Sequence, residues 1–395
     1  YLTFSSISGF SKLDEVQTGD ADFMAAPVLL QHVDLDVTAF TQELRLSSPS
    51  SDRFRWLVGA FYQNRDTDNF LDIPFDDGTG NPLPGPLAVS SHDVGRSKSW
   101  AGFGSASYDI LTDLELTVGA RYDEDKRTSV DEVFANSDVS STFTSFQPKL
   151  QVAWKAASAL NLYATYGEGF GSGGFNAYIA GPSARRYDAQ TATNYEVGMK
   201  GAVLNGIVTY SAALFQVDYD NQQLFFITAN PPSQNIVNID RTRVRGAELE
   251  LTVRPADGLQ IAAGLGLTDP EIRSFAREPS AIGNRTPQAT KYTFNLNGDY
   301  TVPLSADIDL RAYAGYRRQS SVYWDAANSL RTGPKDFVDL RLFLDTESWS
   351  AGLFAKNIGN TQYPTQAAAH ALGQGMHLRI PSTRGVYGVE ASYRF

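Results

Sequence analysis

Apolar and polar residues alternate along this chain with a period of two. In Gly385–Phe395, aromatic and aliphatic side chains occupy one parity, and small or charged side chains occupy the other. Similar alternation marks residues 114–123, 259–267 and 339–345. Successive side chains of a strand point to opposite faces, so the pattern predicts strands with one apolar face. Charged residues on the other face cannot lie in lipid at low cost, so that face must line a wet or protein-filled space.

The connections between these runs are alternately short and long. Most runs are roughly 11–15 residues, longer than ordinary strands and long enough to cross a bilayer at a tilt. The sequence predicts about sixteen strands, with short turns at one rim and long loops at the other, which is typical of an outer-membrane barrel. A β-propeller would repeat every 40–50 residues, and no such repeat is present. We therefore predict an all-β protein, a transmembrane antiparallel up-and-down β-barrel. The long loops are expected at residues 13–32, 66–95, 128–140, 171–189, 221–236, 269–289, 320–335 and 359–382.

One predicted strand, Arg96–Tyr108, has an ambiguous orientation. Trp100 and Phe103 lie on opposite parities, so the pattern does not say which of them faces lipid. The final strand is clearer, because it ends on Tyr393 and Phe395, as strands of outer-membrane barrels do at the water–lipid boundary. We expect these two aromatics to mark the periplasmic rim and to act as the signal for membrane assembly.

Composition narrows the function classes. The net charge is −11 and the pI is about 4.9, which argues against general nucleic-acid binding. Cysteine is absent, which excludes disulfides, thiol catalysis and cysteine-based zinc sites. The sequence has no apolar run of 18 residues and no signal peptide, and Tyr1–Phe4 already has a strand pattern. We therefore expect residues 1–395 to be the C-terminal part of a barrel.

Seven motifs, in order along the chain, resemble those of TonB-dependent receptors. An aromatic strand followed by a glycine-rich loop, Asn161–Asn176, resembles the mid-barrel strand and loop of that family. The other six are similar to the family's strand motifs or to the segment before its last strand: Gln42–Ser47, Trp56–Tyr62, Thr193–Lys200, Arg245–Leu251, Phe354–Tyr363 and Pro381–Gly385. The last of these departs from the usual pattern around Arg384.

The resemblance implies a barrel of 22 strands, the size associated with plugged outer-membrane transporters. About sixteen strands are present here, so roughly six would be missing, together with the N-terminal plug and the energy-coupling box. The chain would then be a fragment of a receptor, although a shortened barrel is the alternative. Plug residues cannot be assigned in this sequence.

The implied function is energy-coupled uptake of a scarce, bulky ligand across the outer membrane of a Gram-negative bacterium. A ferric siderophore is the first candidate, followed by cobalamin, a carbohydrate or another metal chelate. The implied partners are TonB with its inner-membrane complex, the lipid bilayer and lipopolysaccharide. Two alternatives remain: a passive sixteen-stranded porin-like channel, and a non-transporting surface or assembly protein on a receptor-like barrel.

The candidate ligand contacts are aromatic, basic and histidine residues in or beside the long loops. Two arginine pairs, at 185–186 and 317–318, could bind an anionic ligand or lipopolysaccharide phosphates, or could be solvated charges. About half of the loop aromatics should instead belong to the aromatic girdle at the rim. The candidates are Tyr178, Arg185, Arg186, Phe225, Phe226, Tyr323, Trp324, Tyr363, His370, His377 and Arg379.

Metal and nucleotide sites are weakly supported. The four histidines, His32, His92, His370 and His377, all fall in predicted loops, where solvated side chains are the commoner outcome. The acidic residues between Asp66 and Asp77 could hold calcium but lack the EF-hand spacing. Residues 169–174 match G-x-G-x-x-G, but no helix follows to receive a pyrophosphate.

Catalysis is not expected. The serine, histidine and acidic residues follow no signature of nucleophile, base and orienting group. We predict that the protein is not an enzyme and needs no cofactor.

Overall fold

The computed structural model describes residues 1–21, 28–178, 181, 184–229, 232–368 and 377–395. The described chain is almost entirely strand, with two short 3-10 turns, η2 (Leu204–Gly206) and η3 (Pro279–Ala281). The strands are β1 (Thr3–Asp20), β2 (Leu30–Ser47), β3 (Phe54–Ile73), β4 (Val89–Leu111), β5 (Leu114–Asp131), β6 (Val139–Ala157), β7 (Leu160–Gly171), β8 (Gly174–Phe175), β9 (Arg186–Tyr187), β10 (Gln190–Val203), β11 (Val208–Ala229), β12 (Pro232–Ala256), β13 (Leu259–Ser274), β14 (Tyr292–Pro303), β15 (Asp309–Gln319), β16 (Val322–Tyr323), β17 (Arg331–Thr332), β18 (Lys335–Asp345), β19 (Trp349–Lys356), β20 (Pro364–Ala368), β21 (Leu378–Pro381) and β22 (Val386–Tyr393).

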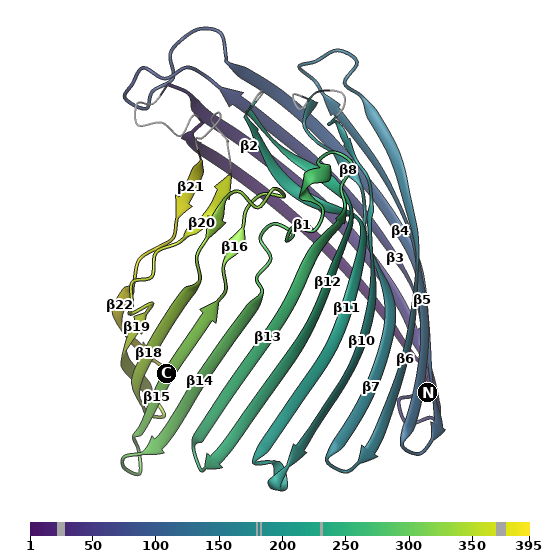
Figure 1. Cartoon of the computed structure of the whole chain (residues 1–395), viewed down its shortest axis with the longest axis vertical. Coiled ribbons are helices and arrows are strands. Elements are labelled where there is room, and N and C mark those ends of the chain that lie inside the picture. Colours follow the sequence, from purple (N-terminus) through teal and green to yellow (C-terminus); the bar gives the residue numbers. More distant parts are fainter. Residues whose placement is uncertain (22–27, 179–180, 182–183, 230–231, 369–376) are drawn as a thin grey trace.

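Sixteen of these strands form one antiparallel sheet. Its order is β1-β2-β3-β4-β5-β6-β7-β10-β11-β12-β13-β14-β15-β18-β19-β22, so each strand pairs with the sheet strand that follows it in sequence. The other strands form three small hairpins, β8–β9, β16–β17 and β20–β21, in the long loops. Figure 1 shows the sheet curled into the wall of a cylinder, with short turns at one end and long loops at the other. The prediction of an up-and-down barrel with about sixteen strands present is confirmed.

The two faces of the sheet differ as the alternation predicts. Leu342 and Leu353 form a cross-strand pair on the apolar face and remain 48% and 59% exposed. Their neighbours Arg341 and Phe354 pair on the opposite face. An exposed band of large apolar side chains suits a bilayer, and its polar reverse suits a wet lumen.

The structure resolves the orientation of the strand that contains Trp100. The Trp100 ring lies 5.5 Å from the ring of Tyr122, and both are on the outer face. Phe103 faces the lumen, where the guanidinium of Arg121 lies 5.5 Å from its ring. Trp100 therefore belongs to the aromatic belt, and Phe103 belongs to the lumenal wall.

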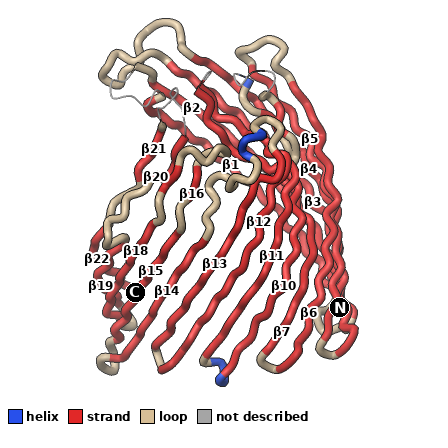
Figure 2. The backbone as a smooth tube through the Cα atoms, in the orientation of Figure 1, coloured by secondary structure: helices blue, strands red, loops and turns tan. Residues whose placement is uncertain are grey.

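Several strands extend far beyond the predicted boundaries, so parts of the expected loops are strand. β3 runs to Ile73 and β4 starts at Val89, within the predicted loop 66–95. The predicted loop 221–236 is largely the end of the β11–β12 hairpin. These segments lie at the long-loop end of the sheet (Figure 2). Both faces of a strand can be polar outside the bilayer, so the alternation that marks a membrane strand disappears there.

Two histidines expected in loops lie in these strand extensions instead. His32 is in β2 and His92 is in β4. The Nε2 atom of His92 lies 2.7 Å from Asp68, and its Nδ1 atom lies 3.2 Å from Glu132. His92 of β4 therefore lies between Asp68 of β3 and Glu132, the residue directly after β5, rather than extending into solvent from a loop.

The compact hydrophobic core lies among the loops and not inside the cylinder. Ile239, Ile272, Phe275, Ala281 and Ala326 form one buried cluster, and Leu224 packs against it. These residues come from the loop ends of β11–β13 and from the loops after β13 and β16. Burial there stabilises the outer loops, whereas the membrane strands expose their apolar face to lipid. Among the described residues, no helix is long and apolar enough to cross a membrane.

Candidate functional site

Arg185 is the centre of a buried polar cluster that fixes the loop between β7 and β10. Its side chain is only 7% exposed, and one of its nitrogens lies 3.1 Å from Asp93 of β4. It also donates to the Ser129 hydroxyl at 2.8 Å and to the carbonyl oxygen of Asn176. Asp93 lies in β4, Ser129 lies in β5 and Asn176 lies in the loop itself, so the guanidinium ties two neighbouring strands to the loop between β7 and β10.

Tyr178 and Asn176 extend this cluster. The Tyr178 ring stacks on Phe134 at 4.9 Å, and the guanidinium of Arg185 lies 5.9 Å from it. The Asn176 side chain accepts from the N–H of Ile236 at 2.8 Å and donates to its carbonyl oxygen at 2.9 Å. Arg185 and Tyr178, both predicted as ligand contacts, thus lie together. Arg185 is already occupied by internal partners, whereas Tyr178 is half-buried.

Arg186 lies next to Arg185 in sequence but in a different environment. It is 55% exposed, lies 3.2 Å from Asp188 and packs over the Phe143 ring at 5.4 Å. An exposed ion pair of this kind contributes little to stability. Arg186 is therefore more accessible to a ligand than Arg185.

Tyr323 and Trp324 belong to a second group of loops. Arg285 lies 5.1 Å from the Tyr323 ring, and the indole N–H of Trp324 donates to Thr332 at 2.7 Å. The first contact joins the loop after β13 to the β16–β17 hairpin, and the second lies within that hairpin. The two aromatics form a separate group from Arg185 and Tyr178.

Tyr363 lies in a third group, at the loop end of β15 and β18. Its ring meets Phe337 edge-on at 5.4 Å, and the ammonium of Lys335 lies 4.1 Å from its centre. The guanidinium of Arg317 lies 4.6 Å from the centre of the Phe337 ring. We name Arg317, Lys335, Phe337 and Tyr363 the rim cluster. Sequence reasoning missed Lys335 and Phe337, which appear from the sequence to be an ordinary start of a strand.

The remaining candidates do not join these groups. Phe225 is exposed on the β11–β12 hairpin, and Phe226 follows it there. Arg379 is exposed on β21, His377 just precedes that strand, and His370 lies outside the described residues. The predicted contacts thus occupy several points around one rim rather than a single pocket.

The acidic residues Asp76 and Asp77 accept hydrogen bonds within their own loop. Asp77 accepts hydrogen bonds from the backbone N–H and the hydroxyl of Thr79, which lower the pKa of its carboxyl. Asp76 accepts from the N–H groups of Gly78 and Gly80. Within the described part of the chain, no three histidine, aspartate or glutamate residues are placed to hold a metal ion.

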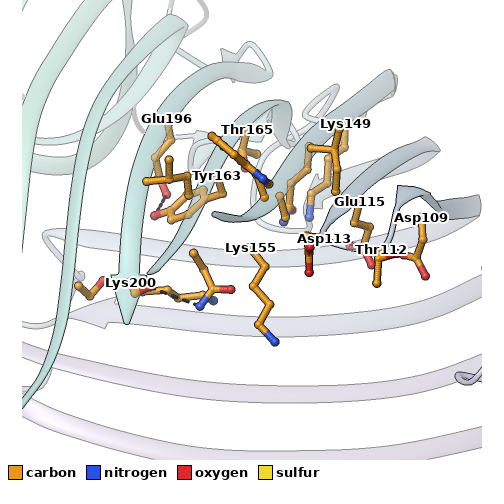
Figure 3. Close-up of a pocket in the computed structure, with 17 residues that line it drawn as sticks. Asp109, Thr112, Asp113, Glu115, Lys149, Lys155, Tyr163, Thr165, Glu196 and Lys200 are labelled. Carbon is orange, nitrogen blue, oxygen red and sulfur yellow. Dashed lines mark hydrogen bonds between the residues drawn. The ribbon is translucent and has the colours of Figure 1, made fainter. Parts of the chain in front are cut away.

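A polar pocket of about 630 Å³ opens on the lumenal face at the short-turn end (Figure 3). Tyr163 donates to Glu196 at 2.7 Å, and Arg55 forms ion pairs with Asp109 and Glu115. The pocket is also lined by Lys149, Lys155 and Lys200. Such mixed charge requires water or polar protein, so this face cannot lie in lipid. None of the predicted ligand contacts lines it.

The chain end lies at the same rim as this pocket. The N–H of Arg394 donates to the carbonyl of Ser348, in the short turn between β18 and β19, at 2.7 Å. The rings of Tyr393 and Phe395 lie 6.3 Å apart, and both are exposed. This placement agrees with the rim expected for them, and their role as an assembly signal remains a prediction.

These features define a class of protein, a membrane-spanning β-barrel wall with short turns at one rim and elaborated loops at the other. The family model described as "TonB dependent receptor-like, beta-barrel" matches residues 3–358. The chain therefore belongs to the TonB-dependent receptor family.

Individual relatives support this assignment. The chain is 27% identical over 169 residues to the ferric-pyoverdine BN7/BN8 receptor of Pseudomonas putida, a match covering 42% of this chain and 20% of that protein. It is 22% identical over 216 residues to the ferripyoverdine receptor of Pseudomonas aeruginosa, covering 53% and 25% of the two chains. Its structure is similar to that of the ferric yersiniabactin uptake receptor from Yersinia pestis, with a TM-score of 0.82 at 17% identity, covering 99% of this chain and 58% of that one. The chain thus matches only part of the length of its relatives.

Proposed function

We propose that this chain forms part of the barrel of an outer-membrane receptor that takes up a scarce, bulky ligand by TonB-coupled transport. A ferric siderophore is the first candidate for that ligand. The proposal depends chiefly on the family match over residues 3–358, which coincides with a barrel wall whose long loops meet at one rim. The relatives named as ferric-pyoverdine receptors support the ligand class.

The edges of the sheet support further strands in the whole receptor. β1 and β22 stand at the two ends of the strand order and are not paired with each other. Unpaired backbone groups at a sheet edge are costly in hydrocarbon, so membrane barrels are closed. We propose that residues 1–395 are the C-terminal part of a barrel of 22 strands. The plug and the contact with TonB would lie in other parts of that protein.

The bilayer and lipopolysaccharide are the proposed surroundings of the outer face. Lys98 and Lys126 are a directly opposed cross-strand pair on that face, beyond Trp100 and Tyr122. Like charges in such a pair repel each other, and no carboxylate of the described residues forms an ion pair with either lysine. Phosphate groups of the outer leaflet would relieve this repulsion.

Uptake measurements in the native host test the proposal. Cells lacking the complete gene, cells lacking TonB and wild-type cells would be supplied with a panel of radio-iron chelates under iron starvation. We expect at least one chelate to require both proteins for uptake, with the complete gene restoring transport. Uptake that is unaffected by deletion of the receptor for every chelate would contradict the proposal.

A passive sixteen-stranded channel is the main alternative, and the structure offers little support for it. A porin needs its first and last strands paired, whereas β1 and β22 have no register with each other in the described chain. Receptor-dependent uptake that persists without TonB would nevertheless favour this alternative.

A further inference from the structure

The rim cluster has an unusual charge arrangement. Arg317 and Lys335 flank two aromatic rings that meet edge-on, with the Arg317 guanidinium 4.6 Å from the Phe337 ring and the Lys335 ammonium 4.1 Å from the Tyr363 ring. Phe337 is only 6% exposed, so the ring pair is a fixed platform. Among the described residues, neither cation forms an ion pair with a carboxylate.

Arg318, the next residue in the sequence, differs from Arg317 because it is paired with a carboxylate. Arg318 lies on the outer face, 2.9 Å from Asp336, and its Nε donates to the hydroxyl of Tyr292 at 3.1 Å. Arg317 points to the lumenal face, because successive side chains of a strand alternate. Arg318 is thus neutralised by a carboxylate of the protein, whereas Arg317 has no carboxylate partner among the described residues.

The carboxylates closest in sequence to the rim cluster are already engaged. Asp336 is taken by Arg318 and by the hydroxyl of Tyr316, which donates at 2.6 Å. Asp339 shares the lumenal face with Phe337, but its Oδ1 accepts the backbone N–H of Asn357 at 2.7 Å. In the described part of the chain, the cluster is therefore positive without an internal counter-ion.

A short turn holds Tyr363 in place beside Phe337. Asn357 and Asn360 have φ values of +52° and +48°, a backbone conformation that asparagine tolerates better than most residues. The Asn357 side chain accepts from the N–H of Thr361 at 3.0 Å, and Tyr363 is fixed by a hydrogen bond from the N–H of Ser382 to its carbonyl at 2.8 Å. These hydrogen bonds to the backbone thus fix the position of Tyr363.

We propose that the rim cluster is a binding subsite for an anionic group on a ring-bearing metal chelate. A carboxylate or phenolate oxygen would be held by Arg317 and Lys335, whose N–H donors suit such oxygens, while a ligand ring packs against Tyr363. This inference rests on the proposed function, since it specifies the charge of the transported ligand. The rim cluster lies at the loop end of β15 and β18. This position favours a small ligand that arrives from outside, rather than an acidic segment of the receptor itself, as the occupant.

Binding to the complete, purified receptor tests the subsite. The probes are a trianionic iron(III) tris-catecholate and an uncharged iron(III) tris-hydroxamate of similar size, at low and high salt. We expect the receptor to prefer the anionic chelate. The variants R317Q and K335Q should each weaken that binding about tenfold, because removing one charge contact is worth of the order of one decade in affinity. R318Q, on the outer face, is the matched control and should stay within about twofold of wild type.

The outcomes separate this inference from the proposed function. Binding of a chelate without any preference for negative charge, or equal losses for both chelates in R317Q, would overturn the subsite and leave the receptor function standing. Failure to bind any ferric chelate would count against the proposed function itself. If removal of other parts of the receptor tightened anion binding, an acidic segment of the receptor itself would be the occupant of the rim cluster. This result would overturn the small-ligand assignment. The variant R317K, which retains the charge, should recover most of the affinity, and heat-modifiable migration on gels verifies that each variant is folded.

Discussion

The two sides of the lumenal wall use positive charge in different ways. On β3–β6, arginines form ion pairs within the wall: Arg55 with Asp109 and Glu115, Arg121 with Asp123, and Arg127 with Asp125. On β15 and β18, Arg311 also pairs with Asp345, but Arg317 and Arg341 lie over the rings of Phe337 and Tyr313 and have no carboxylate partner among the described residues. The first arrangement stabilises the wall, and the second leaves positive charge available to the lumen.

The same contrast occurs at the rim between Arg185 and Arg317. Arg185 is buried and connects β4 and β5 to the loop between β7 and β10, whereas Arg317 is exposed on the lumenal face. A basic residue in a loop is therefore not in itself a ligand contact. The number of internal partners decides whether its charge is structural or available for binding.

The largest effect is expected from removing the charge that is most fully paired. Arg185→Ala leaves Asp93 with its charge largely buried and uncompensated, which typically costs about 3–5 kcal/mol. Because the barrel strands stay paired, we expect local opening of residues 172–178 and 184–189, measured by faster hydrogen exchange in the complete receptor. Arg186→Ala is the matched control and should change exchange little. Equal increases in hydrogen exchange for the two variants would show that the burial of Arg185 does not distinguish its role from that of Arg186.

A smaller effect is expected from disrupting the turn that positions Tyr363. Asn357→Ala removes the acceptor for the Thr361 N–H and introduces a side chain that is disfavoured at positive φ, at a cost of about 1–2 kcal/mol. Affinity for the anionic chelate should fall as in Tyr363→Ala, and the two losses should not add in the double variant. Additive losses would show that Asn357 acts independently of Tyr363. Asn357→Gly, which tolerates positive φ but lacks the acceptor, isolates the loss of the hydrogen bond.

Reducing the charge of the lysine pair on the outer face should have a modest effect. We expect Lys98→Gln with Lys126→Gln to weaken the association of lipopolysaccharide with the purified receptor by a few fold, since each contact is exposed and screened by salt. Copurified lipopolysaccharide, measured by mass spectrometry, gives the readout. Lys12→Gln, on the outer face of the edge strand, serves as the comparison. An unchanged amount would show that the like charges are tolerated without an anion.

The smallest effect concerns Asp77, a charge stabilised by hydrogen bonds and not by a cation. Its pKa is lowered in the folded loop, chiefly by the Thr79 hydroxyl, so its stabilising contribution is present above the usual carboxyl pKa and is lost as the pH falls through the lowered value. We expect the exchange of residues 77–81 to rise below about pH 4, after correction for the intrinsic pH dependence of exchange. Asp77→Asn should show much less of this acid-dependent change. A similar pH profile in that variant would exclude Asp77 as the cause.

The sequence by itself determined the membrane barrel. A lipid-facing strand must be apolar on one face along its whole length, so alternation and strand length together specified the architecture, and motifs such as Asn161–Asn176 specified the family. It also placed most loop residues at the correct rim, because short turns and long loops alternate. The ends of β3, β4, β11 and β12 were not predictable, since hairpins outside the bilayer have no required apolar face.

Only the tertiary structure decided which of the loop residues are available to a ligand. Arg185 and Arg186 are indistinguishable as sequence, and so are Arg317 and Arg318, yet each pair divides into a residue neutralised by close partners and a residue that is freer to meet a ligand. The partners of Arg185 come from as far as 92 residues away in the chain. Such pairing depends on the register and curvature of the whole sheet. Local sequence therefore determines the wall, and only the assembled loops determine the binding surface.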